Sequence, residues 1–189
     1  IDPATLLDGF RIRDGSSDPA KGGAGILIRN ADSSVIKQCL FIGNNSATFG
    51  GAIYLEASTN ISISTSWFNS NVSVEGGGAI EVGIDSDVSI NSCNLIGNQS
   101  NTGGAIMNEG SIVLSNSFLY TNVADRGGAL ASNSAVGNCQ VSNCTIAQNL
   151  ALLTGGGVII ESGPISIMNT IVWGNQHLSG EDETAQIMI

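Results

Sequence analysis

The chain has 189 residues and a formal net charge of −10, from 16 acidic and 6 basic side chains. This balance argues against nucleic acid as a partner, because phosphate binding needs clustered Lys and Arg, and no apolar run approaches the roughly 18 residues that span a bilayer. The 25 glycines, the many Ile and Val residues and the scarcity of proline favour a mostly β protein with frequent turns.

The chain opens on short apolar segments around Leu7, Phe10 and Ile12 and then repeats a pair of motifs. The first motif is Gly-Gly-Ala-Ile or a close variant, and the second is an apolar residue, two variable residues and Asn. Both motifs recur in steps of 24 to 28 residues. The aliphatic residues of the first motif are Ile26, Ile53, Ile80, Ile106, Leu130 and Val158. The asparagines of the second motif are Asn44, Asn71, Asn98, Asn122, Asn149 and Asn175.

Three short alternating strands fit into each repeat, for example at 51–55, 60–64 and 66–68. The absence of helical periodicity argues against leucine-rich repeats. Because stacked coils place equivalent residues about 4.8 Å apart, we predict an all-β fold. It is a right-handed parallel β-helix of about seven coils with three strands per coil, forming a single domain over 1–189.

Both ends of the chain are predicted to lie within a coil. The opening apolar segments read as strands two and three of a first coil, and 186–189 reads as strand one of a last coil. Neither end carries an obvious polar cap, which solenoids normally need. We therefore expect either a segment of a longer solenoid, paired with further coils of a parent chain, or a subunit that stacks end to end with other copies.

Stacking also predicts the role of each motif. The glycines suit a turn with positive φ or close backbone approach, and the asparagines suit a structural ladder in which each amide bonds to the next coil. Besides the aliphatic row of the first motif, two inward ladders are expected. They are Ile36, Ile63, Ile90, Leu114, Val141 and Ile167, and Phe41, Phe68, Leu95, Leu119, Ile146 and Val172.

The four cysteines are predicted to be buried free thiols. Cys39, Cys93 and Cys144 share one ladder but lie two coils apart, roughly 9.6 Å, which is beyond disulfide reach. Cys139 takes the place of an apolar residue in another ladder. Spacings typical of a zinc site are absent.

The pairing of the two motifs resembles the repeats of the chlamydial polymorphic outer-membrane proteins. The match is complete where 50–53 accompanies Phe41 and Asn44, and where 77–80 accompanies Phe68 and Asn71. Later coils replace Phe by Leu, Ile or Val. The segments at 7–12 and 170–175 are also similar to a broader family of bacterial β-helix repeat proteins. The resemblance implies a secreted or bacterial cell-surface protein and, for the chlamydial family, adhesion.

Candidate chemistry is confined to the outer face of strand one, which would form a groove. Glu56, Glu81 and Glu109 lie on consecutive coils and would supply paired carboxylates if the chain is an enzyme, and Tyr54 with Glu81 would bind a sugar. Solvation of an exposed sheet is the simpler explanation of these carboxylates, so we lean against catalysis. The single histidine, His177, falls in a terminal loop, so no Ser-His-Asp arrangement is expected.

No metal site or cofactor is expected, apart from weak Ca²⁺ binding by oxygens at 85–87, 14–18 or 181–183. Three functions stay open. The first is a non-catalytic extracellular or surface β-helix for adhesion, display or filament assembly, with a host or matrix surface as partner. The second is carbohydrate binding or polysaccharide cleavage in the strand-one groove. The third is ice binding by the flat, small-residue outer face of strand two, which lacks the expected threonine rows.

Overall fold

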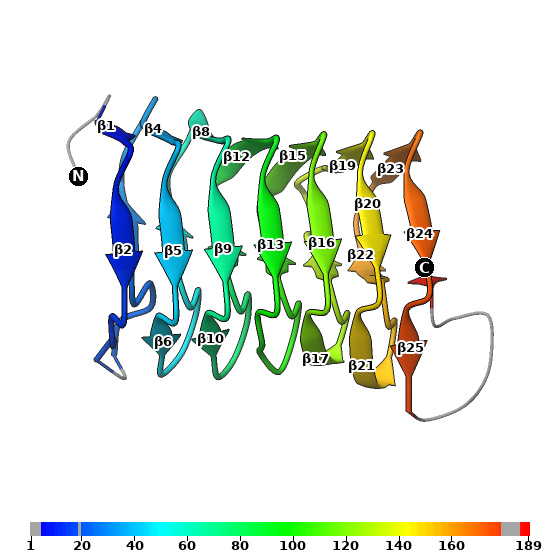
Figure 1. The fold of residues 1–189 in the computed structure, drawn as a ribbon. Helices are drawn as coiled ribbons and strands as arrows, with labels where there is room; N and C mark the ends of the chain where they lie inside the picture. The colour runs from blue at the N-terminus through cyan, green and yellow to red at the C-terminus, as the bar shows by residue number, and fades with distance from the viewer. Residues whose placement is uncertain (1–4, 19, 179–185) are drawn as a thin grey trace.

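The computed structural model describes residues 5–18, 20–178 and 186–189, and over these residues the chain is a parallel β-helix without helical segments (Figure 1). Three sheets of seven strands run the length of the stack, and every pairing within them is parallel. The predicted fold class is therefore confirmed. Each coil contributes one strand to each sheet, because the same pattern of apolar residues and turns returns in every repeat.

The sheets are named here after the order of their strands within a coil. Sheet one consists of β3 (Ile26–Arg29), β7 (Ile53–Glu56), β11 (Ile80–Val82), β14 (Ile106–Asn108), β18 (Leu130–Asn133), β22 (Val158–Ser162) and β26 (Ile187–Met188). Sheet two consists of β1 (Leu6–Asp8), β4 (Val35–Lys37), β8 (Ile61–Ser64), β12 (Asp87–Asn91), β15 (Ser111–Ser115), β19 (Cys139–Ser142) and β23 (Ile165–Met168). Sheet three consists of β2 (Arg11–Arg13), β5 (Leu40–Ile42), β9 (Trp67–Asn69), β13 (Asn94–Ile96), β16 (Phe118–Tyr120), β20 (Thr145–Ala147) and β24 (Ile171–Trp173).

Short strands in the turn after the asparagine ladder were not predicted. They are β6 (Asn45–Ser46), β10 (Val72–Ser73), β17 (Val123–Arg126), β21 (Leu150–Thr154) and β25 (Gln176–His177). The placement of His177 in a terminal loop was wrong, since this residue pairs with Ala151 and is only 8% exposed. These strands have only two to five residues and no shared apolar pattern, so their periodicity is too weak to be recognised.

The predicted inward ladders are confirmed by the strand register. Ile53 pairs with Ile80, Ile63 with Ile90, and Phe68 with Leu95. In the middle coils these side chains are fully buried and form one continuous core. The Phe41 and Phe68 rings stack with centroids 4.8 Å apart, which is the spacing of adjacent coils.

The asparagine ladder is also confirmed. The Asn98 Oδ1 atom accepts hydrogen bonds from the backbone N–H and the Nδ2 of Asn71, each at 3.0 Å. The Asn98 Nδ2 in turn donates to the Phe68 carbonyl and to Asn122 Oδ1, again at 3.0 Å. At the last coil Gln186 replaces the next asparagine, and its Oε1 accepts from Asn175 Nδ2 at 3.0 Å. Each asparagine side chain thus links the bend in its own coil to the equivalent bends in the neighbouring coils.

Both predicted roles of the paired glycines, a turn with positive φ and close backbone approach, are confirmed. Gly103 has a φ of +64°, and a Cβ there would collide with the Ile106 carbonyl. Gly104 lies against the next coil, where a Cβ would overlap the Gly128 carbonyl oxygen. The first glycine therefore allows the turn and the second allows the close stacking of coils.

The predictions for the cysteines are confirmed, and those for the two ends of the chain are confirmed except at Phe10. All four cysteines are free and buried. Leu7 and Ile12 lie in strands of sheets two and three, whereas Phe10 lies between strands and is 54% exposed. The segment 186–189 contributes β26 to the edge of sheet one.

Candidate functional site

The predicted groove on sheet one is not an open face. Its outward row has the expected register, with Tyr54, Glu81 and Met107 side by side. However, Glu81 is only 1% exposed and Met107 only 7%. The turn before each Gly-Gly motif folds over this row, and a Cβ on Gly76 would meet the Glu81 Oε2 atom. The expectation that the carboxylates of this face are solvated was therefore wrong for Glu81, whereas Tyr54, Glu56 and Glu109 are partly exposed.

The same period predicts a second outward row on sheet one, and the structure differs from it at one end. The predicted row is Arg29, Glu56, Gly83, Glu109, Asn133 and Glu161. A β-bulge between Ser132 and Asn133 shifts the register, so Asn133 pairs with Ser162 instead of Glu161. The Glu161 carboxylate instead forms an ion pair with Arg126, with the Arg126 Nη2 and Glu161 Oε1 atoms 2.6 Å apart. Sequence analysis missed this pairing, because the two residues lie on different segments of neighbouring coils.

Hollows between the turns and sheet one divide the predicted carboxylates. Glu81 and Glu109 line a hollow of about 220 Å³, together with Glu75, Arg126 and Glu161. Glu56 and Tyr54 line a second hollow of about 270 Å³ that also contains Lys21, Arg29 and Glu75. The Arg29 and Glu56 side chains form an ion pair across strands β3 and β7. Glu56 is thus placed apart from the other two candidates.

Glu81 has the most unusual electrostatic environment of this groove. Burial raises the pKa of its carboxyl well above the ordinary value, and the nearby Glu109 and Glu75 carboxylates raise the pKa further. Burial also raises the pKa of Glu109. Burial, followed by the charges of Glu56, Glu81 and Glu109, raises the pKa of the Tyr54 hydroxyl. Within the described part of the chain, the Glu81 Oε2 has no hydrogen-bond partner.

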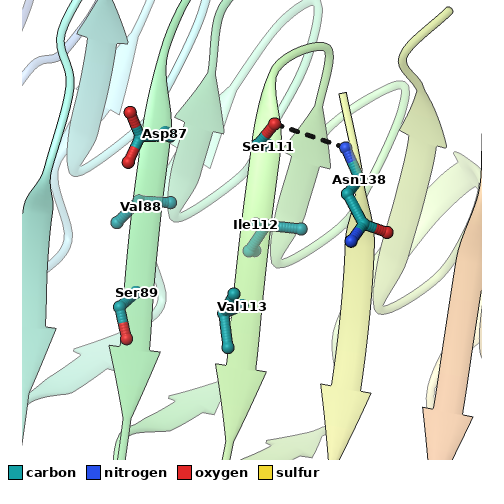
Figure 2. Close-up of a pocket in the computed structure, with 7 residues that line it drawn as sticks. All are labelled: Asp87, Val88, Ser89, Ser111, Ile112, Val113 and Asn138. Carbon is teal, nitrogen blue, oxygen red and sulfur yellow. Dashed lines mark hydrogen bonds between the residues drawn. The ribbon is translucent and has the colours of Figure 1, made fainter. Parts of the chain in front are cut away.

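A third hollow, of about 250 Å³, lies on the outer face of sheet two (Figure 2). Figure 2 shows Ser111 and Asn138 on neighbouring coils, where the Asn138 backbone N–H donates to the Ser111 Oγ at 3.3 Å. The Asp87 Oδ1 accepts a hydrogen bond from the Asn60 backbone N–H at 3.0 Å. Small side chains such as Ser89 and Val113 form the rest of this shallow surface. It offers hydrogen-bonding groups but no deep binding site.

Sheet three presents an exposed aromatic face that sequence analysis missed. Trp67 is 49% exposed and Trp173 66%, and the rings of Phe118 and Tyr120 stack with centroids 5.3 Å apart. Figure 1 shows the strands of sheet three side by side across the front of the stack, with no described segment over them. The outward residues of this face are Arg11, Leu40, Trp67, Asn94, Phe118, Thr145 and Ile171 in one row, and Arg13, Ile42, Asn69, Ile96, Tyr120, Ala147 and Trp173 in the next. The signal in the sequence is a large apolar or aromatic residue on both sides of the inward one in three coils, at β5, β16 and β24, and on one side at β9 and β13.

The outer faces of sheets two and three differ in composition. The outward rows of sheet two carry mainly Ser, Val, Asn and Gln and no aromatic residue. Both tryptophans of the chain lie on sheet three. The only charged residues in its outward rows are Arg11 and Arg13. Large apolar groups are thus gathered on one of the three faces.

Weak Ca²⁺ binding stays an untested prediction. Over residues 5–18, 20–178 and 186–189, no group of three metal-ligating side chains comes together. The candidate loop at 181–183 lies outside the described residues. No helix in the described part of the chain is long and apolar enough to cross a membrane.

The fold and the repeated motifs define the chain as a repeat-built parallel β-helix. A comparison with protein families matches residues 38–56 to the Chlamydia polymorphic membrane protein repeat. This stretch contains β5, β6 and β7, together with Asn44 of the ladder. Comparisons with curated proteins and with solved structures gave no match. The predicted resemblance is confirmed for this repeat, whose family consists of bacterial membrane proteins.

Proposed function

We propose that this chain is a non-catalytic part of a bacterial protein that is secreted or held at the cell surface, where it serves adhesion or display. The observation that carries the proposal is the exposed aromatic face of sheet three. The similarity of residues 38–56 to the chlamydial repeat supports the location at the outer membrane or cell surface. A rod of stacked coils holds such a face in a fixed, flat arrangement along its length.

The chemistry of this face suits protein contact. Tryptophan and tyrosine bury a large apolar area at a small cost in conformational entropy and dominate many binding interfaces. Trp67, Phe118, Tyr120 and Trp173 lie on β9, β16 and β24, within five successive coils that also carry the amides of Asn69 and Asn94. A host or matrix surface that covers this face removes exposed apolar area from water, which favours binding.

The test compares two double variants of the chain on immobilised matrix proteins and cultured host cells. We expect Trp67→Ser with Trp173→Ser to weaken binding about tenfold or more. The control, Val113→Ser with Met168→Ser, alters exposed residues of sheet two and should bind as the original chain does. Equal binding by the two double variants, with unchanged circular dichroism, would contradict the adhesion face.

The display role includes stacking on further coils or on other copies. Electron microscopy beside size-exclusion chromatography tests this part. Ordered filaments with a subunit repeat of roughly 33 Å, the height of seven coils, would identify a filament subunit. A monomer would argue against a filament subunit.

Carbohydrate binding or cleavage at sheet one is a second candidate, favoured by the raised pKa of Glu81 beside Glu109. A glycosidase needs one protonated and one ionised carboxyl group at the bond it breaks. The test incubates the chain with a panel of polysaccharides. Any hydrolysis that survives in the Glu81→Gln variant would exclude Glu81 as the proton donor.

A further inference from the structure

The hollow around Glu81 carries an excess of carboxyl groups. Its lining includes Glu75, Glu81, Glu109 and Glu161, and the only basic side chain there is Arg126. Because Arg126 forms its ion pair with Glu161, three carboxyl groups face the hollow without a cation from its lining. Such a hollow attracts positive charge from outside the chain.

Glu81 is held in the wall of this hollow by its backbone. It is the central residue of β11, between the inward-facing Ile80 and Val82, so its side chain projects from the outer surface of sheet one. The Gly76 backbone lies over the carboxyl group and leaves room for it only because Gly76 has no side chain. With its Oε2 buried and without a described partner, the carboxyl has an unused acceptor. A buried acceptor without a partner is unfavourable, and a bound donor would relieve this cost.

The remaining wall is apolar and aromatic. Phe49 and Met107 line the same hollow. The Phe49 ring lies against Tyr54, with centroids 5.6 Å apart and planes inclined by 38°. An aromatic ring beside carboxyl groups is a combination that binds organic cations, through the ring quadrupole and the anionic oxygens together.

We infer that this hollow binds a primary ammonium group on an alkyl chain, as a polyamine carries it. Glu81 and Glu109 are its anionic partners, and Phe49 is its aromatic wall. An alkylammonium ion fits the site better than a metal ion, because the described carboxyl groups do not converge into a metal-ligating cluster. This inference is independent of the adhesion face on sheet three.

Binding of a cation should release a proton. The free Glu81 carboxyl holds its proton to a pH well above its ordinary range, owing to burial and to Glu109 and Glu75. The other ionisable groups around it are Glu161, Arg126 and Tyr54. A bound ammonium group favours the ionised carboxylate, so the proton passes from Glu81 to the buffer. This release distinguishes the site from loose attraction of cations by an acidic protein.

The test is isothermal titration calorimetry of the whole chain with spermidine at low ionic strength, in two buffers of different ionisation enthalpy. We expect Glu81→Gln to weaken binding about tenfold and to abolish proton release, and Glu109→Gln to weaken binding several-fold. The matched control is Glu56→Gln in the neighbouring hollow, which should stay within about twofold of the original chain.

Three outcomes would overturn the inference. One is the absence of spermidine binding at millimolar concentration. Another is an equal loss of affinity in all three variants, which would indicate general attraction to the acidic chain. The third is binding of neutral oligosaccharides but not of spermidine by this hollow, which would assign it to carbohydrate. Thermal melting of each variant verifies folding, and Glu109→Gln keeps the test valid if Glu81→Gln does not fold.

Discussion

Single residues in the interior of this solenoid are constrained by hydrogen bonding as much as by volume. The side chain of Asn98 takes part in four hydrogen bonds, which join the coils of Asn71, Asn98 and Asn122. Burial removes water as an alternative partner, so each of these groups depends on the ladder.

Replacing Asn98 by Leu should destabilise the chain by about 3–5 kcal/mol, because the N–H groups of Asn71 and the carbonyl of Phe68 lose partners in a dry corner. Urea denaturation measures this change. Asn94→Leu provides the control, since Asn94 lies on the outward side of β13 and should alter stability by less than about 1 kcal/mol. Similar midpoints for the two variants would contradict an energetic role for the ladder.

Glu81→Gln should stabilise the chain at about pH 7.5 by about 1–3 kcal/mol, because it removes a buried ionisable group. The folded-state pKa of Glu81 is raised above the ordinary value of 4.5, so the folded chain retains a proton that the unfolded chain has released. The original chain therefore loses stability as pH rises above 4.5 and through the raised pKa.

The advantage of the Gln variant should vanish when urea denaturation is repeated at about pH 4, where both states hold the proton. Glu56→Gln is the control and should shift stability by at most about 1 kcal/mol at either pH. A Glu81→Gln variant that is equally more stable at both values would show that protonation is not the cause.

At the scale of the coil, two glycines with the same backbone conformation have different surroundings. Gly103 has a φ of +64° and Gly97 a φ of +62°. A Cβ on Gly103 would collide with the Ile106 carbonyl, whereas a Cβ on Gly97 would meet only the Ser70 Oγ at 3.8 Å. Other coils place Ser70, Thr121 and Gln148 at the position of Gly97, all with positive φ.

Gly103→Ala should therefore cost about 3 kcal/mol or more, and Gly97→Ala about 1 kcal/mol, which is the ordinary cost of a left-handed conformation for alanine. Thermal and urea denaturation of both variants measure the difference. Equal costs would mean that φ alone, and not the collision inside the turn, restricts the first glycine of the motif to glycine.

At the scale of the whole molecule, the core is most completely buried in the middle of the stack. Ile80, Ile90 and Leu95 are fully buried, whereas Leu7 and Ile12 at one end and Ile187 at the other are only partly buried. Each coil contacts only its neighbours, so an end coil of this chain receives stabilisation from one side.

Hydrogen exchange followed by mass spectrometry should accordingly show a gradient. Amides of β11, β12 and β13 should exchange at least about tenfold more slowly than those of β1, β2 and β24. Uniform protection from end to end would indicate that the stack unfolds as one cooperative unit and would contradict the gradient.

The sequence by itself determined the class of fold, the three inward ladders, the asparagine ladder and the free thiols. The physical reason is that the parallel strands of this solenoid pair in register, so residues one period apart become neighbours in space. Ile53 and Ile80 could be paired by counting, and so could Cys39 and Ser66. The repeat also indicated the similarity to the chlamydial family, because Phe41 and Asn44 of one motif accompany the glycines at 50 and 51 of the other within a single repeat.

Only the tertiary structure decided what lies above each outward row. The period fixes which residues stack, but it does not fix where a turn folds or whether a bulge shifts the register. The turn at Gly76 covers Glu81. The bulge after Ser132 removes Glu161 from the register with Asn133, and Glu161 forms an ion pair with Arg126. In the part of the chain that the structure describes, Trp67 and Trp173 are largely exposed to water, whereas the Glu81 carboxyl group is buried. Exposure depends on contacts between segments that do not repeat, and these contacts form only when the coils are stacked.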